Sequence, residues 1–504
     1  MKKIIALLIL SLFATTAQAE VKVDPMFGDQ MVLQQEMPVP VWGTADAGEK
    51  VTVAFCGQKK ETTACKEGKW SVKLDALKLG KPGVMTVSGK ENKVEFKDVL
   101  VGEVWVGSGQ SNMAGGTGGY ARRDAVLDKW SKEEVPNLRL YIRGRWEKAG
   151  PNTSKSFSAI AFAFAYSLQK ELKVPVGVMV SAQGGQPSGR WITPAMAADS
   201  CCPVLKSYGA GGAEKVQAAY EAALKKWQAE KAKAEKAGKK FTQRGPRRPI
   251  KMGDLYVGGV EKFVPYAIRG VLWDQGESRT AIPEVDQITA MTALINGWRK
   301  AWDQGDFHFL HVQKPSGGGP AWDPSNPVNT GAVKFTEQPT APQVVPLGRL
   351  KYPLDHVKIA TLKNAPIVTA IDLGPGIHPS CKSGYGARAC RVALGSAYGK
   401  DVAICGPTYK SHKAEGNKIR VSFDNLGKGL AYKHGKKLQG FEVAGADGKW
   451  DWAEATIDGD SVVLVNAKIA KPLEVRYGVG QRPSYANLFN KDGLPALLFT
   501  TQKE

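Results

Sequence analysis

The chain has 504 residues, 43% of them hydrophobic and 13 of them tryptophan, which is enough for large buried cores and too long for a single domain. Its formal net charge of +21 favours anionic partners, and many of the basic residues fall within residues 225–251. Only Trp227 and Phe241 interrupt that run, a spacing too sparse for the base-stacking surface of a nucleic-acid-binding protein. A solvated helix face is the ordinary explanation of such a run. A surface for anionic glycans or envelope polymers is the functional alternative.

Residues 1–19 have the three parts of a secretory signal peptide. Lys2 and Lys3 precede an apolar run over residues 4–14, and cleavage is expected after Ala19. The apolar run is too short to span a bilayer, and no later stretch reaches the roughly 18 apolar residues that a membrane helix needs. We therefore expect an exported protein, periplasmic or secreted, without a transmembrane segment.

Residues 20–98 alternate short apolar runs with turn residues, which predicts a small antiparallel β-sandwich. The runs that carry this prediction are 39–42, 50–55, 69–74 and 84–89.

Between residues 99 and 400 the pattern changes to strands that alternate with helices, which is typical of a parallel α/β sheet. Strands are expected at 103–106, 174–181 and 307–312 and within 266–278; helices are expected at 158–172, 213–237 and 287–302. The Lys-rich segment at about 213–250 is predicted to be a helical insertion. Residues 313–350 are rich in glycine and proline and should be mostly loop.

Residues 401–504 return to β-type runs at 418–423, 461–466 and 473–478, which predicts a C-terminal β-rich domain. The seven cysteines are odd in number and scattered. Cys56 and Cys65 flank one expected hairpin and are able to pair, but no single disulfide is predicted. No cysteine or histidine spacing suggests a metal site, and neither a metal nor a cofactor is expected.

The most informative segment is GEVWVGSGQSNM at residues 102–113. An apolar strand ends in Gly107-Ser108-Gly109, and Ser111 follows where a helix is able to begin. A serine on such a turn exposes its hydroxyl while its own N–H stays free to donate, as a nucleophile with an oxyanion donor requires. The segment is not the G-x-S-x-G elbow of α/β-hydrolases, because Met113 stands two residues after Ser111.

Three further patches share this character of a buried strand followed by small or polar residues: 181–185, 275–277 and 372–379. Ligands of open α/β sheets bind beyond the carboxyl ends of the strands, so the four patches should meet in one crevice. Ser111 would supply the nucleophile and His378 the general base. The N–H groups of Gly184 or Gly185 and the amide of Gln275 would bind the developing oxyanion.

These motifs resemble those of the sialate O-acetylesterase family, which belongs to the SGNH-type hydrolases. The resemblance rests on GEVWVGSGQSNM, the Gly-Gly patch that runs to Trp191, VLWDQGES at 271–278 and the D-x-G-x-x-x-H-P motif that begins at Asp372. It extends over nearly the whole chain after residue 19. It implies an SGNH-hydrolase-like three-layer α/β fold with a parallel sheet, flanked by the β-sandwich and the C-terminal β-rich region.

The resemblance also implies roles for single residues. Ser111 matches the nucleophile and His378 the catalytic histidine of the family, Gly184-Gly185 match its oxyanion glycine, and residues 275–277 match its Q-G-E. The implied reaction removes O-acetyl groups from a sugar, typically sialic acid, through an acetyl-serine intermediate.

The acid that supports His378 is left open by the sequence. Family members often carry an aspartate two residues before the histidine, where this chain has Gly376. Three alternatives remain: Asp372 orients His378, Glu277 does so from a neighbouring strand, or the site works as a Ser–His pair steadied by a backbone carbonyl. We prefer Asp372.

Other residues near the motifs are candidates for support or substrate binding. Gln110 and Glu277 flank the expected site. Arg190 and Trp191 would hold a sugar carboxylate and a sugar ring face, or else are a surface arginine and a packing residue. At Gln186 and Asp274 the chain departs from the family pattern, and we expect both side chains to lie in the wall of the substrate pocket.

The sequence thus predicts an exported serine esterase for O-acetylated glycans, most readily those of sialic acid. An esterase for acetylxylan or another glycan is the first alternative, and a non-catalytic glycan-binding protein is the second. The sequence does not determine the oligomeric state.

Overall fold

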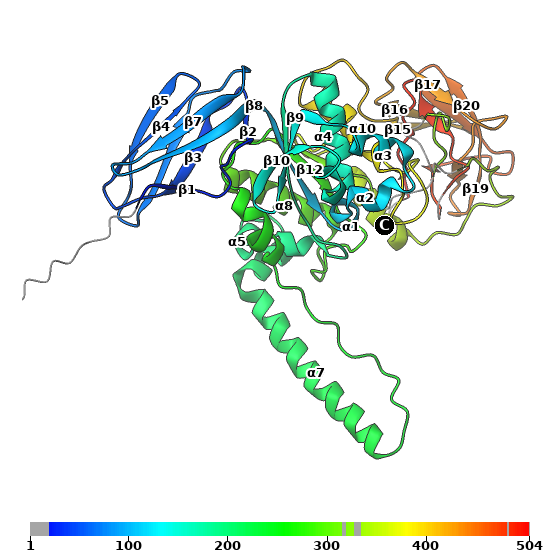
Figure 1. The fold of residues 1–504 in the computed structure, drawn as a ribbon. Helices are drawn as coiled ribbons and strands as arrows, with labels where there is room; N and C mark the ends of the chain where they lie inside the picture. The colour runs from blue at the N-terminus through cyan, green and yellow to red at the C-terminus, as the bar shows by residue number, and fades with distance from the viewer. Residues whose placement is uncertain (1–19, 315–318, 327–333, 481–482, 503–504) are drawn as a thin grey trace, which may run out of the picture.

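The computed structural model describes residues 20–314, 319–326, 334–480 and 483–502. The predicted signal peptide lies outside the described residues. Among those that are described, no helix has both the length and the hydrophobicity to span a bilayer. Two β-rich regions flank a central α/β region, and a long helix projects from its middle (Figure 1).

The N-terminal region forms two sheets from strands close to the predicted runs. One sheet has the order β1-β3-β6 (Lys22–Val23, Val39–Thr44, Lys69–Leu74). The other contains the antiparallel strands β4, β5 and β7 (Lys50–Phe55, Gln58–Thr63, Gly83–Ser88). Inward-facing side chains such as Val41, Val53 and Val87 are fully buried, because alternate residues of each strand point into the shared core.

One strand joins this region to the centre of the molecule. β8 (Lys93–Gly109) pairs with β7 over its first half and with β11 (Val176–Ala182) and β12 (Gly270–Asp274) over its second half. β2 (Val32–Gln34) pairs with β8 at the point where its partners change. The predicted boundary between residues 98 and 99 therefore falls inside a continuous strand.

A buried carboxylate holds that junction together. Glu103 on β8 is fully buried, and its oxygens accept hydrogen bonds from Gln35 (2.6 Å), Arg269 (2.8 Å) and Tyr398 (3.0 Å). These partners come from the N-terminal region, from the segment before β12 and from the segment after α10. A buried charge needs this degree of pairing, so the junction is fixed in one geometry.

The central sheet has the order β10-β9-β11-β8-β12-β13-β14 and is parallel from β9 to β14. The strands not yet bounded are β9 (Val135–Ile142), β10 (Arg145–Ala149), β13 (His308–Val312) and β14 (Ile367–Val368). β10 is the antiparallel edge. The parallel α/β sheet predicted for this region is confirmed.

Both faces of this sheet are covered. Trp105 and Leu272 point toward α4 (Ala159–Leu172) and α10 (Lys382–Ser396), whose buried residues share their core. Their neighbours Val106 and Trp273 point the other way, into a core that contains α8 (Gln287–Trp302). Because strand residues alternate between faces, strand segments covered on both sides are apolar, as residues 104–106 of β8 and 271–273 of β12 are.

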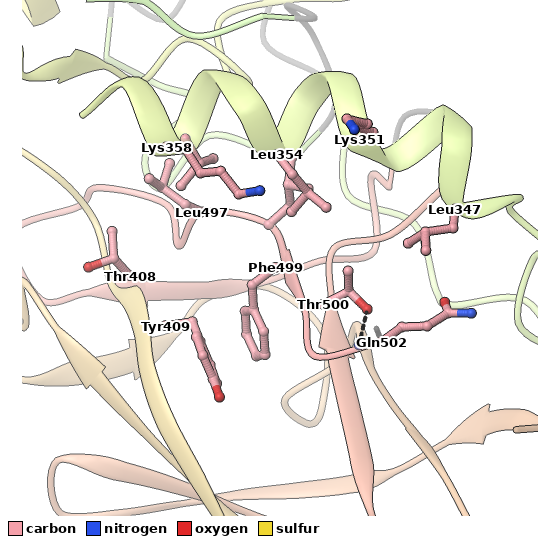
Figure 2. A pocket seen from close by; sticks show the side chains of 12 residues that line it. Leu347, Lys351, Leu354, Lys358, Thr408, Tyr409, Leu497, Phe499, Thr500 and Gln502 are labelled. Atoms are coloured by element: carbon pink, nitrogen blue, oxygen red, sulfur yellow. Dashed lines mark hydrogen bonds between the residues drawn. The ribbon is translucent and has the colours of Figure 1, made fainter. Parts of the chain in front are cut away.

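The segment predicted to be loop at 313–350 contains the start of an unpredicted helix, α9 (Leu347–Ile359). Pro353 inside it and Gly348 near its start are residues that normally argue against a helix. α9 faces β24 (Phe499–Thr500) across a pocket of about 340 Å³, which Leu347 and Leu354 line from the helix (Figure 2). The first strand after the central region is β15 (Thr408–Glu415).

The C-terminal region is β-rich, as predicted. Its four-stranded sheets are β15-β16-β21-β20 and β19-β18-β22-β24. The expected runs correspond to β16 (Lys418–Asp424), β21 (Ser461–Val465) and β22 (Glu474–Tyr477). All seven cysteines lie in the described part of the chain, and none of them forms a disulfide there.

The projecting helix is α7 (Ala213–Lys236), and the chain returns along it over residues 237–250 (Figure 1). We call α7 and residues 237–251 the arm. None of the residues of α7 is buried. The return segment packs on Trp227, whose ring lies 5.7 Å from that of Phe241 and whose Nε1–H donates to the Gln243 carbonyl at 2.9 Å.

Replacing Trp298 with alanine should destabilise the central region by about 3–5 kcal/mol, because it empties a large volume in a close-packed core. Trp298 is fully buried and contacts the rings of Trp273, Trp302 and Phe309. Chemical denaturation would measure the loss. Val344→Ala, at a side chain that is 97% exposed, is the control and should change stability by less than about 0.5 kcal/mol. Equal stabilities of the two variants would contradict the assigned core.

Candidate active site

The turn between β8 and the short helix α1 (Ser111–Ala114) presents Ser111 at the carboxyl end of the central sheet. The turn depends on Gly109, which has φ +132°. A Cβ atom at this position would lie 2.1 Å from the Asp274 carbonyl oxygen on β12, so any other residue would push the two strands apart. The Gln110 N–H donates to that carbonyl at 2.8 Å and fixes the residue before Ser111.

The segment after β14 brings His378 to the same point. Its Nε2 lies 2.7 Å from the Ser111 Oγ, within direct proton-transfer reach. His378 is exposed, whereas Ser111 is half-buried. Two residues separated by 266 others in the chain are therefore in contact, as the convergence of strand ends predicts.

Gly184 lies directly beside Ser111. A Cβ atom at Gly184 would be 3.4 Å from the Ser111 Cβ. Within the described residues, neither the Ser111 N–H nor the Gly184 N–H has a protein acceptor. Gly185 has φ +72° and faces open space. Two unused backbone donors next to a serine hydroxyl are the geometry that an oxyanion site needs.

Asn112 connects the turn that carries Ser111 to the segment that carries His378. It is fully buried, and its Nδ2 donates to the Ile377 carbonyl at 2.9 Å and to the Glu277 Oε1 at 3.3 Å. Its Oδ1 accepts from the Lys382 Nζ at 2.6 Å. Because Asn112 follows Ser111 and Ile377 precedes His378, one amide fixes the positions of both.

A charged layer lies under the site. Lys314 is fully buried at the end of β13, and its Nζ lies 2.8 Å from Asp274 and 3.0 Å from Glu277. Burial, the largest effect, raises the pKa of Asp274. Gly276 between the two acids allows this packing, since a Cβ there would lie 2.7 Å from the His356 ring and from Lys314.

Lys382 is the second buried cation of this layer. Its Nζ lies 4.6 Å from the ring centres of both Tyr120 and Tyr385. Burial outweighs the attraction of Asp274 and lowers the pKa of Lys382 to about 7. The amine is enclosed beneath the Ser111 turn, where it donates to the Asn112 Oδ1.

The geometry does not support the roles predicted for Gln275 and Asp372. The Gln275 Nε2 donates to the carbonyls of Gln186 (3.3 Å) and Arg279 (3.0 Å), so both of its N–H groups are used and the predicted oxyanion role is wrong. Gln275 is a structural link between loops. Asp372 is held by Arg388 at 3.0 Å. In the part of the chain that the structure describes, no carboxylate contacts His378, which favours a Ser–His pair; the backbone carbonyl that the third alternative invoked is not among the described partners of the imidazole either.

Trp191 does not face a substrate. It is 1% exposed and packs against Trp273 with ring centres 5.3 Å apart, so its predicted sugar-stacking role is wrong. Arg190 is paired with Asp254 and donates to the Gln186 Oε1 at 2.6 Å, which leaves little of its charge for a sugar carboxylate. Asp274, expected in the pocket wall, is fully buried under it.

The other two supporting candidates have structural partners. Gln110 is 3% exposed, and its Oε1 accepts from the Ser278 N–H at 3.4 Å. Glu277 binds Lys314 and Asn112 rather than His378. Both therefore support the loops around the serine.

The motifs in the sequence did not identify Asn112, Lys314 or Lys382 as parts of the site. Each lies next to a recognisable feature: Asn112 follows Ser111 inside GQSNM, Lys314 follows β13, and Lys382 follows the His-Pro motif. Nothing in the sequence indicated that the two lysines are buried. Among the described residues, no group of three or more His, Cys, Asp or Glu side chains is arranged to hold a metal ion.

Comparison with known proteins agrees with the motifs. A family model described as "Carbohydrate esterase, sialic acid-specific acetylesterase" matches residues 101–243. The sialate O-acetylesterase of Mus musculus is 26% identical over 532 residues, covering 94% of this chain and 92% of that protein. The Rattus norvegicus sialate O-acetylesterase is also 26% identical, over 55% of each chain. The chain thus spans about half the length of the rat relative.

A solved structure shares the fold over nearly the whole length. The crystal structure of a carbohydrate acetylesterase from Xanthomonas citri is 26% identical, with a TM-score of 0.74, and the match covers 96% of this chain and 100% of that one. The predicted resemblance is confirmed: the chain is similar to sialate O-acetylesterases in sequence and to a carbohydrate acetylesterase in fold.

Replacing Asn112 with alanine should lower kcat by about 10²-fold while the Ser111 hydroxyl and His378 imidazole remain, because the turn that holds the histidine loses its anchor. Ester turnover and thermal unfolding would be measured together. Asn425→Ala, in an exposed turn of the C-terminal region, is the control for loss of an asparagine. Unchanged kcat in Asn112→Ala would contradict the positioning role.

Replacing Lys382 with methionine should change how stability depends on pH. The pKa of Lys382 is about 7 in the folded protein and ordinarily 10.5. Between these values the unfolded chain binds more protons, so this group's contribution to stability rises with pH. The stability of Lys382→Met relative to the wild type should therefore fall from pH 7 to pH 9 in urea unfolding.

The charged groups that act on Lys382 are Asp274, Glu277, Lys314 and Cys381, and all of them remain in the variant. Lys400→Met, at an exposed lysine, is the control and should show no such pH dependence. A stability difference that stays constant from pH 7 to pH 9 would exclude a depressed pKa at Lys382.

Proposed function

We propose that the protein is a carbohydrate O-acetylesterase that uses Ser111 as nucleophile and His378 as general base. The observation that carries this proposal is the 2.7 Å contact between the Ser111 Oγ and the His378 Nε2. The relationship to carbohydrate acetylesterases in sequence and in fold supports the reaction class.

In the proposed reaction, His378 takes the hydroxyl proton as the Ser111 oxygen attacks the acetyl carbonyl carbon. The N–H groups of Ser111 and Gly184 bind the resulting oxyanion, and one such donor contributes about 3–4 kcal/mol to the transition state. His378 then protonates the departing sugar oxygen. Water, deprotonated by His378, attacks the acetyl-serine, and collapse of that intermediate releases acetate and restores the Ser111 hydroxyl.

Sialic acid is the sugar that the family relationship favours, and we propose it as the main substrate within an SGNH-type mechanism. Acetylated xylan is the alternative that substrate comparison must test. We further propose, from the signal-peptide pattern of residues 1–19, that the protein is exported to the periplasm or beyond.

Ser111→Ala and His378→Ala should each lower kcat for an aryl acetate by roughly three orders of magnitude or more, since both groups act in the same proton transfer. Acetate release from the aryl acetate, O-acetylated sialic acid and acetylated xylan would be measured. The control is Ser71→Ala, on an exposed position of β6. Substantial acetate release by folded Ser111→Ala would exclude the mechanism.

A serine-directed organophosphorus probe separates an esterase from a glycan-binding protein with an inactive site. The probe should label the wild type at Ser111 and should not label Ser111→Ala. Failure to label the wild type would favour the binding protein.

A further inference from the structure

A large groove adjoins the active site at the base of the arm. Its volume is about 1030 Å³, and it extends from Gly185 and Glu277 to the return segment of the arm and to α9. We call it the arginine groove, because Arg247, Arg248 and Arg279 line it. The mechanism proposed above uses none of these arginines.

The three arginines come from separate parts of the chain. Arg247 and Arg248 end the return segment of the arm, and Arg279 follows β12 in the loop after Glu277. All three are exposed, and within the described residues none forms an ion pair with an acid. The Arg279 guanidinium lies 5.4 Å from the ring centre of Tyr352, which also lines the groove.

The acidic residues of the groove do not balance these charges. Glu277 is paired with Lys314 at 3.0 Å. Asp286 caps α8 by accepting from the Thr289 N–H at 2.9 Å, and Asp355 is only 3% exposed. The groove therefore presents unpaired guanidinium groups, whose planar donors match carboxylates in pairs.

The arm extends this positive surface away from the body of the molecule (Figure 1). Residues 213–251 contain nine lysines and three arginines against four glutamates. The helix is exposed along its length, and the return segment beside it is held by Trp227. The arginine groove reaches Gly185, the residue after Gly184, which lies beside Ser111.

We infer that the arginine groove and the arm bind a carboxylate-bearing glycan chain whose acetylated sugar lies at Ser111. The inference rests on the proposed esterase function and extends it, because it assigns the substrate as an anionic oligosaccharide or polymer rather than a free sugar. Carboxylates of the neighbouring sugars pair with the arginines of the groove, and the chain continues along the arm.

The test uses the full chain carrying Arg247→Ala, Arg248→Ala and Arg279→Gln together. Hydrolysis of an O-acetylated polysialic acid should lose roughly tenfold or more in kcat/KM, mainly through KM, since each exposed charge pair contributes modestly. Hydrolysis of acetylated xylan and of an aryl acetate should not change. Added salt should weaken only the wild type's action on the anionic chain.

Binding is measured separately with Ser111→Ala, which is not expected to turn over. Polysialic acid and polygalacturonate should bind this variant, and adding the three arginine substitutions should weaken binding by a similar factor. Lys436→Ala with Lys437→Ala removes two charges from an exposed turn of the C-terminal region and should leave binding unchanged.

Each outcome distinguishes the two proposals. Wild-type kcat/KM on the anionic chain in the triple variant would overturn the groove and leave the esterase intact. An equal loss on the aryl acetate would overturn the groove too, because the arginines would then act on the catalytic pair. Tighter binding of single-stranded nucleic acid than of polysialic acid would also exclude a glycan site.

Discussion

The close approach of β8 and β12 at Gly109 is the constraint on which the site depends. The Asp274 carbonyl lies where the side chain of any other residue would stand, and it accepts the Gln110 N–H at 2.8 Å. The strand therefore turns sharply into α1, so Ser111 begins a helix instead of continuing the sheet. Its N–H remains unused because the first residues of a helix have no intrahelical acceptor. The positions of the proposed nucleophile and of one proposed oxyanion donor thus follow from a single missing side chain.

The buried charges beneath this turn explain how an exposed histidine keeps its position. Burying Lys314, Lys382, Asp274 and Glu277 disfavours folding unless the groups pair with one another. Lys314 binds both acids, and Lys382 is left to bind the Asn112 oxygen. That bond fixes the orientation of the asparagine amide, so its nitrogen must face the Ile377 carbonyl. The layer thus specifies one arrangement of the histidine turn without itself contacting His378.

The sequence was sufficient for the parts of the site that topology determines. Parallel strands end at one edge of a sheet, so Ser111, Gly184 and His378 had to converge once the strands were recognised. The sequence was insufficient where the role of a residue depends on the direction in which its side chain points. Gln275 and Trp191 stand in the right segments but point into the interior, and Asp372 points to Arg388. The sequence also gave no sign that the two lysines of the site are buried. A lysine is normally expected at the protein surface, yet Lys314 and Lys382 are fully buried.

A Ser–His pair without a carboxylate changes which interactions must carry the proposed catalysis. An acid beside the imidazole normally holds its tautomer and stabilises the cation that forms during proton transfer. Here Glu277 and Asp372, the two acids that the sequence offered, pair with Lys314 and Arg388, and the exposed imidazole leaves stabilisation of the cation to water. The transition-state stabilisation that the protein itself supplies then comes from the proposed oxyanion site, where the backbone N–H groups of Ser111 and Gly184 donate without any change of protonation. The hydrogen bond between Asn112 and the Ile377 carbonyl holds the backbone next to His378 in place. The proposed base is therefore supported by the position of its backbone and not by the charge of a neighbouring acid.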